Sequence, residues 1–274
     1  IELPRLLAAS DGIALDESSD ELLGLLLAPG SSLGGARPKA SVLDTDGSLS
    51  IAKFPKRDDE IDTVRWEALA LTLAEHAGIE VNPWRLERLD DRFILVVRRF
   101  DRDAERRLPF LSAMSMVGAD DGDTRSYLEI ADALRQYGAE ASNDLQALWR
   151  RVVFSVLISN TDDHLRNHGF LYSGNAGWRL SPAYDLNPVP VDLKPRYLST
   201  AIDLYDTQAS IDLALTVAPY FALDADDAGA IANDVARSVR DWRTVAAGLG
   251  LARPAIERMS SAFEHDDLTS ALAL

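Results

Sequence analysis

The chain has 274 residues, 47% of them hydrophobic, a length that suits one large domain or two lobes around a shared cleft. Its formal net charge of −16 makes direct nucleic acid binding unexpected, because binding phosphates requires clustered Lys and Arg. The absence of cysteine excludes disulfides and thiolate metal sites.

The first third of the chain is predicted to contain most of the strands. Runs of strand-forming residues bounded by turn residues predict these strands. They span residues 40–43, 49–54, 84–89 and 93–97. Residues 3–27 are typical of one or two short helices with a turn near Asp11 and Gly12. The apolar spacing of residues 63–77 predicts a helix that ends at Gly78.

The remainder of the chain is predicted to be mostly helical. The predicted helices span residues 126–137, 143–159 and 226 to the C-terminus, with breaks at 248–250 and Pro254. A small hairpin over residues 170–172 and 178–180 interrupts them. We therefore predict an α+β, bilobal fold. A strand-rich N-lobe would span residues 1–105 and a helical C-lobe residues 106–274, with a cleft at their junction.

The strongest motif lies where a buried apolar helix ends in the polar loop of residues 158–167. Asp162 is followed five residues later by Asn167, which is the spacing of the protein kinase catalytic loop. In such a loop the Asp reaches the attacking hydroxyl and the Asn reaches a magnesium ion on the other side of the γ-phosphate. Taken alone, these residues could equally cap a helix or form a turn. Asp185 and Lys53 favour the catalytic interpretation.

A second acidic motif, residues 181–188, follows the small hairpin. Asp185 lies 18 residues after Asn167 and would correspond to the metal-binding Asp of the kinase Asp-Phe-Gly motif. Magnesium prefers oxygen ligands, so Asp185 and Asn167, with phosphate oxygens and water, would form a reasonable shell. The alternative is that Asp185 is an ordinary turn residue.

Lysine is rare in this chain, because most of its 28 basic residues are Arg. The lysines are Lys39, Lys53, Lys56 and Lys194. Because Lys is a compact point charge and Arg a planar fork, each Lys marks a position at which we expect that Arg does not serve. Lys53 lies in a predicted strand, like the kinase Lys that holds the α- and β-phosphates, and Glu67 of the next helix is its natural partner.

A loop with paired glycines, residues 31–39, precedes the first strand. Glycines let backbone amides approach a phosphate closely. The sequence is neither a Walker A loop nor the usual kinase glycine-rich pattern, and Gly34 and Gly35 could form an ordinary turn. Asp163 and His164 raise the alternative of a metal-dependent phosphohydrolase, but no other His has ligand spacing with them. We expect His164 to pack against and hydrogen-bond the catalytic loop.

In this order, the motifs resemble those of the HipA family, the serine/threonine-protein kinase toxins of type II toxin–antitoxin systems. The resemblance covers about residues 28–245 and rests on five segments. These are residues 32–39, 51–54, 98–102, 160–168 and 180–188. It implies a protein-kinase-like fold related to phosphoinositide kinases.

The resemblance also implies roles for individual residues. Asp162 would be the catalytic base, and Asn167 and Asp185 would be catalytic residues that bind Mg²⁺. The implied ATP-binding residues are Ser32, Leu33, Gly34, Gly35, Lys39, Lys53, Glu67, His164 and, in the hinge, Arg99 and Phe100. In this family a phosphate-loop Ser can itself be phosphorylated, which ejects the loop and silences the enzyme. Ser32 is the matching position, with Ser31 beside it.

Partners follow from the same resemblance. Family members bind a small DNA-binding antitoxin and phosphorylate a component of translation. The resemblance therefore implies a HipB-like antitoxin as partner, and an aminoacyl-tRNA synthetase or another translation factor as protein substrate.

Two departures from the family pattern stand out. Family members commonly have a subdomain of about a hundred residues before the phosphate loop, whereas residues 1–30 precede it here. We expect either a fragment or a shortened branch whose N-terminal subdomain is on another chain, which weakens the case for antitoxin binding. The hinge also has Arg98 where an acidic residue is common.

Two other functions stay open. Aminoglycoside and lipid kinases share the Asp-to-Asn spacing, so a small-molecule kinase is one alternative. A nucleotide-binding pseudokinase that acts as an interaction module is another, although the complete set of motifs argues against it. No apolar run approaches the roughly 18 residues that span a membrane, and no signal peptide is evident. We expect a bacterial cytoplasmic protein, trimmed at its N-terminus because it begins with Ile1.

Overall fold

The computed structural model describes residues 3–14, 37–56, 58–103, 106–120 and 122–274. The chain divides into two compact units. Unit 1 comprises residues 1–68 and 82–107, and unit 2 comprises residues 69–81 and 108–274. The functional division into lobes at residue 105 stays a prediction.

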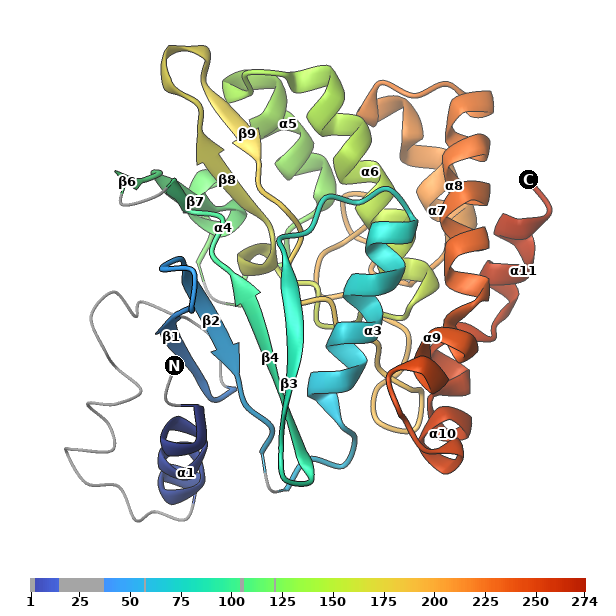
Figure 1. Cartoon of the computed structure of the whole chain (residues 1–274). Helices are drawn as coiled ribbons and strands as arrows, with labels where there is room; N and C mark the ends of the chain where they lie inside the picture. The colour runs from blue at the N-terminus through green and yellow to red at the C-terminus, as the bar shows by residue number, and fades with distance from the viewer. Residues whose placement is uncertain (1–2, 15–36, 57, 104–105, 121) are drawn as a thin grey trace. The chain divides into compact units, whose positions relative to one another are not determined.

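Unit 1 is built on a four-stranded antiparallel sheet in the order β1-β2-β4-β3 (Figure 1). The strands are β1 (Lys39–Leu43), β2 (Leu49–Lys53), β3 (Trp84–Leu89) and β4 (Arg92–Arg98). Both predicted hairpins are confirmed. In the first turn, the Asp44 amide donates to the Ser48 carbonyl at 2.8 Å. In the second, Asp90 adopts a left-handed φ of 56°, which Asp tolerates better than most residues.

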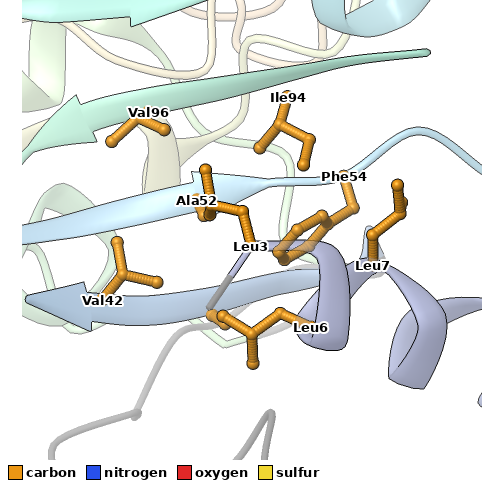
Figure 2. Close-up of a cluster of buried hydrophobic side chains, with 9 residues drawn as sticks. Leu3, Leu6, Leu7, Val42, Ala52, Phe54, Ile94 and Val96 are labelled. Carbon is orange, nitrogen blue, oxygen red and sulfur yellow. The ribbon is translucent and has the colours of Figure 1, made fainter. Parts of the chain in front are cut away.

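Helix α1 (Leu3–Ala14) packs on one face of this sheet (Figure 2). The buried cluster between them consists of Leu3, Leu6, Leu7, Ala40, Val42, Ala52, Phe54, Ile94 and Val96. The predicted turn near Asp11 and Gly12 is wrong, because the helix continues through both residues. The Asp11 carboxylate accepts two hydrogen bonds of 2.8 Å from the Arg92 guanidinium on β4. This pairing with the sheet stabilises the last turn of the helix against the cost of its glycine.

A strand pair belongs to unit 1, and one helix contributes residues to both units. Strands β5 (Arg102–Asp103) and β6 (Arg106–Arg107) form a short separate pair. Helix α3 (Thr63–His76) was predicted correctly, and Gly78 follows it with a φ of +69°, the left-handed conformation that commonly ends a helix.

Unit 2 is mainly helical, as predicted, with α6 buried at its centre. Its α-helices are α4 (Ala113–Met116), α5 (Tyr127–Tyr137), α6 (Ala141–Leu157), α7 (Ile211–Val217), α8 (Ala225–Arg240), α9 (Trp242–Gly248), α10 (Arg253–Phe263) and α11 (Asp266–Leu272). Helices α5 and α8 both pack against α6 (Figure 1). Ser126 and Glu129 form a capping box at the start of α5. The C-terminal region breaks at two places that we did not predict, Asp241 and His265.

A second sheet in unit 2 contains the predicted small hairpin. Strands β8 (Gly169–Tyr172) and β9 (Trp178–Leu180) form it, and β7 (Phe110–Ser112) pairs with β8 as an unpredicted third strand. The hairpin places residues 165–167, a short 3-10 helix, directly before β8. Within the described ranges, no helix combines the length and apolar character needed to cross a membrane.

Candidate active site

The predicted catalytic loop follows α6. Ser159 adopts a left-handed φ of 52°, and its hydroxyl donates to the Ala262 carbonyl at 2.8 Å. The loop then closes on itself, because Asn167 Nδ2 donates to the backbone oxygen of Asp162 at 3.0 Å. This bond uses the amide nitrogen of Asn167, so its carbonyl oxygen is the side-chain atom that would bind a metal ion. The Asp162 side chain is 65% exposed, so its carboxylate is accessible to an acceptor.

Asp163, next to the proposed base, is the buried centre of a polar cluster. Its carboxylate accepts hydrogen bonds from the Tyr127 hydroxyl at 2.5 Å and the Ser155 hydroxyl at 3.0 Å, and His168 Nε2 lies 2.9 Å from its other oxygen. Burial opposes ionisation, but the His168 imidazole and the two hydroxyl donors outweigh it and lower the pKa of Asp163. Thr200 Oγ1 also donates to the Asp163 carbonyl at 2.7 Å. The cluster holds the loop between α5 and α6.

His164 contributes to the loop through its backbone. Its amide donates to the Asp162 carbonyl at 2.9 Å, and its carbonyl accepts from the Asn167 amide at 2.8 Å. Within the described part of the chain, the imidazole Nδ1 has no hydrogen-bond partner. The predicted ATP contact of His164 stays a prediction, and a second imidazole, that of His168, lies against the Asp163 carboxylate.

The Asp185 segment lies against the catalytic loop. Asp185 has a φ of 55°, a left-handed conformation that is uncommon outside glycine and that Asp tolerates better than most residues. Three hydrogen bonds join the two segments. They run from Asn187 N to Asn160 Oδ1 (3.1 Å), from Val189 N to Ser159 O (3.2 Å) and from the Tyr184 hydroxyl to Arg166 O (2.8 Å). The structure therefore brings the predicted Asp185 motif and the predicted catalytic loop of residues 158–167 together within unit 2.

Asn167 and Asp185 have the donor chemistry that a magnesium ion prefers. One amide oxygen, one carboxylate, phosphate oxygens and water would complete its shell. No group of three or more His, Asp or Glu side chains able to hold a metal occurs among the residues described. A magnesium ion that nucleotide phosphates help to hold does not need such a group, so these two residues fit the role.

Lys53 and Glu67 form the predicted ion pair in unit 1. Lys53 Nζ lies 2.5 Å from Glu67 Oε1, and both side chains are largely buried. Lys39 is directly opposite Lys53 in the β1–β2 register. Because strand side chains alternate, both lysines lie on the face of the sheet opposite α1. Two facing ammonium groups favour an anionic ligand on this face.

The hinge residues have structural contacts of their own. The Arg99 guanidinium is buried, donates twice to the Asp101 carboxylate at 2.8 Å and donates to Ser41 Oγ at 3.3 Å. Burial opposes ionisation of Asp101, but Arg99 and Arg102 outweigh it and lower its pKa. The ATP contacts predicted for Arg99 and Phe100 stay predictions.

The predicted phosphate loop falls largely outside the described residues. These undescribed positions are Ser31, Ser32, Leu33, Gly34, Gly35 and Ala36. The residues that follow them are placed. Arg37 bonds to both Asp59 oxygens at 2.9 and 3.0 Å and to Thr63 Oγ1 at 2.8 Å. The exit of the loop is thereby attached to the start of α3.

Sequence reasoning missed Lys194 as a neighbour of the site. Its Nζ donates to the Thr161 carbonyl at 3.3 Å and lies 3.9 Å from Asp162 Oδ1. The rarity of lysine was the available signal. The partners of Asp163 had no comparable signal, because Tyr127 and Ser155 lie on helices where a polar side chain is unremarkable.

Comparison with known proteins places this chain among relatives of HipA. Residues 31–243 match the HipA-like C-terminal domain family. The chain belongs to this family. The match includes every predicted site residue, from the phosphate loop to the Asp185 segment.

Two bacterial relatives illustrate the family. "Putative kinase" of Haemophilus influenzae is 30% identical over 111 residues, which are 36% of this chain and 32% of that protein. "Putative kinase Y4mE" of Sinorhizobium fredii is 27% identical over 183 residues, which are 57% of this chain and 41% of that protein. The chain thus matches less than half the length of these two relatives.

Two solved structures share the fold. One is a chain of the Shewanella oneidensis MR-1 toxin–antitoxin complex of HipA, HipB and operator DNA. It has a TM-score of 0.66 and 19% identity, over 97% of this chain and 69% of that chain. The other is the Helicobacter pylori proinflammatory kinase CtkA, with a TM-score of 0.67 and 16% identity, over 90% of this chain and 94% of that chain. The likeness confirms the predicted mixed helix-and-strand, kinase-like fold.

Proposed function

We propose that this protein transfers the γ-phosphoryl group of ATP to a Ser or Thr hydroxyl of a protein. The observation that carries the proposal is the joining of the loop of residues 158–167 to the Asp185 segment by three hydrogen bonds. Phosphoryl transfer needs a carboxylate that the acceptor can reach and side-chain oxygens of the kind that magnesium prefers, and this arrangement combines the two.

Each residue has a defined task in the proposed reaction. Asp162 orients the acceptor hydroxyl and takes its proton as the new O–P bond forms and the bond to ADP breaks. Lys53, held by Glu67, binds ATP phosphates. Asn167 and Asp185 would hold Mg²⁺, which when bound neutralises charge on the phosphate oxygens. Positioning and electrostatics then supply most of the rate.

A protein acceptor is favoured over a small molecule by the exposure of Asp162. A base whose side chain is 65% exposed is accessible to a protein segment. The presence of Lys53, Asp162, Asn167 and Asp185 together favours catalysis over a pseudokinase role. We further propose a translation component as acceptor, and a HipB-like antitoxin or a separate N-terminal subdomain as partner. The Shewanella relative in complex with HipB supports this partner.

Self-phosphorylation at Ser32 or Ser31 would provide the simplest readout. Wild type, Asp162→Asn and the control Asp192→Asn are incubated with MgATP, and intact masses are compared. Asp192 is an acidic residue that pairs with Arg258 at 3.0 Å and has no assigned role. We expect one added phosphate on wild type and Asp192→Asn, mapped to Ser32 or Ser31, and none on Asp162→Asn.

Nucleotide titration separates the remaining outcomes. Asp162→Asn should bind MgATP like the wild type, because the proposed base acts on the acceptor and not on ATP. Phosphate transfer by Asp162→Asn at the wild-type rate would refute the assignment of the base. A wild type that neither gains mass nor binds ATP in the presence of magnesium would refute the kinase proposal itself.

A further inference from the structure

Lys194 is a charged group next to the proposed base that the reaction described above does not use. It is the sole lysine after Lys56. It lies in the segment that follows Asp185, and its side chain is 44% exposed. A lysine so close to an exposed carboxylate in an arginine-rich chain calls for a physical reason.

The position of Lys194 is set by several hydrogen bonds. Its backbone amide donates to the Pro190 carbonyl at 3.2 Å, which closes a turn. Its ammonium donates to the Thr161 carbonyl at 3.3 Å. The same carbonyl also accepts from Ser199 Oγ at 2.9 Å, so two side chains of this segment attach to the residue before Asp162.

Stability does not account for this arrangement. An ion pair between two exposed side chains contributes about 0–1 kcal/mol at most. The distance of 3.9 Å from Lys194 Nζ to Asp162 Oδ1 is also longer than a charge-assisted hydrogen bond, which is about 2.7–2.9 Å. Asp162 is therefore loosely paired, and its carboxylate stays available to a hydroxyl.

At 3.9 Å from Asp162 Oδ1, the Lys194 ammonium is also close to the place where the proposed reaction occurs. An acceptor hydroxyl bound to Asp162 lies about 2.7 Å from its carboxylate, and the phosphorus bonds to that hydroxyl oxygen during transfer. The long, flexible side chain of a lysine can move with the phosphoryl group during transfer. A cation beside Asp162 can therefore contact oxygens of the transferred phosphoryl group.

We propose that Lys194 is a further catalytic residue, whose ammonium contacts the phosphoryl group during transfer. This inference rests on the proposed kinase function. The hydroxyl oxygen forms a bond to the γ-phosphorus, and the bond from that phosphorus to the β-bridging oxygen breaks, with its electron pair leaving on ADP. The hydroxyl proton moves to Asp162. Lys194 keeps its proton throughout and neutralises charge on the phosphoryl oxygens.

Chemical labelling tests the contact directly, because the chain has four lysines. In an acyl phosphate of ATP, the acyl group is attached to the γ-phosphate. A nearby lysine attacks the acyl carbon, forms an amide and releases ATP. We expect peptide mass spectrometry to find acylated Lys53 and Lys194, and excess ATP to suppress both. Lys56 has no assigned role and is the internal control, so its labelling should not respond to ATP.

Kinetics tests the contribution to the reaction. Lys194→Met should lower kcat for phosphate incorporation about 100-fold, the lower end of the range for losing one group that stabilises developing charge. Its ATP affinity and Tm should stay close to the wild-type values. Lys194→Arg should recover only part of the rate, because a planar fork replaces a point charge. Arg258→Met, which removes a positive charge beside Asp192, is the matched control and should retain wild-type kcat.

The two proposals fail in different ways. An active wild type in which ATP does not protect Lys194 and Lys194→Met keeps kcat within about twofold would refute the role of Lys194 alone. A wild type with neither phosphate transfer nor ATP-protected labelling of any lysine would refute the kinase function and this inference with it.

Discussion

Replacing Tyr127 with Phe removes one hydroxyl from the buried cluster at Asp163 and leaves the shape of the core unchanged. Tyr127 is fully buried, and its hydroxyl donates to Asp163 at 2.5 Å. Phe fills the same space, so no large cavity forms. Asp163 keeps Ser155 and His168 as neighbours but loses one of its two hydroxyl donors.

The size of the expected fall in Tm follows from the negative charge of Asp163, which accepts the hydrogen bond from Tyr127. A hydrogen bond to an ionised group contributes about 1.5–3 kcal/mol to stability. In a protein of this size, each kcal/mol lowers Tm by about 2–4 °C. We therefore expect Tyr127→Phe to lower Tm by about 3–12 °C. Tyr205→Phe is the matched control, because Tyr205 is 84% exposed, and it should lower Tm by less than about 2 °C.

Differential scanning calorimetry at neutral and acidic pH measures this effect. The pKa of Asp163 is lowered in the folded state, so its contribution is present above the unfolded-state pKa and is lost as pH falls through the folded pKa. The difference between wild type and Tyr127→Phe should therefore shrink in acid. A Tm at neutral pH that matches that of Tyr205→Phe would show that the hydroxyl does not stabilise the cluster.

Three further predictions concern other parts of the chain. Burial, followed by the Arg196 charge, lowers the pKa of His265 to about 4. The unfolded state then binds more protons than the folded state between about pH 6.5 and 4, so the free energy of unfolding should fall by roughly 3 kcal/mol as the pH falls through that interval. His265→Gln should flatten this slope in acid titrations followed by circular dichroism. Gly177→Ala should destabilise the protein by about 2–4 kcal/mol in urea unfolding, because its φ is +113° and a Cβ would lie 2.5 Å from a backbone oxygen. Gly174→Ala, at φ +70°, meets no atom within 4 Å and should destabilise it by about 1 kcal/mol. Equal losses of stability in the two variants would contradict the steric argument. Glu67→Gln should weaken ATP binding about 10-fold in titration calorimetry by releasing Lys53 from its 2.5 Å pair, and unchanged affinity would show that the pair does not position the lysine.

Local signals in the sequence predicted the elements that depend on near neighbours. The hairpins over residues 40–54 and 84–97 have their turn residues between their strands, and α3 has apolar spacing followed by Gly78. The Asp162-to-Asn167 spacing likewise identified a loop whose closing hydrogen bond spans five residues. In each case the residues that stabilise the element lie within it or close to it in the sequence.

Elements that depend on distant partners were missed or misjudged. Strand β7 forms only because β8, more than fifty positions later in the chain, offers an unpaired edge. The helix through Gly12 persists because Asp11 meets Arg92. The break before α11 is stabilised by His265, whose Nδ1 caps the helix.

The candidate site shows the same division. The sequence by itself determined which residues are the catalytic candidates, because Asp162, Asn167 and Asp185 stand at the spacings of the kinase catalytic loop and metal-binding motif. Only the tertiary structure decided that Asp163 is buried beneath the loop and that Lys194 reaches Asp162. Burial and through-space charge depend on which helices and loops pack together, and no local pattern records that packing.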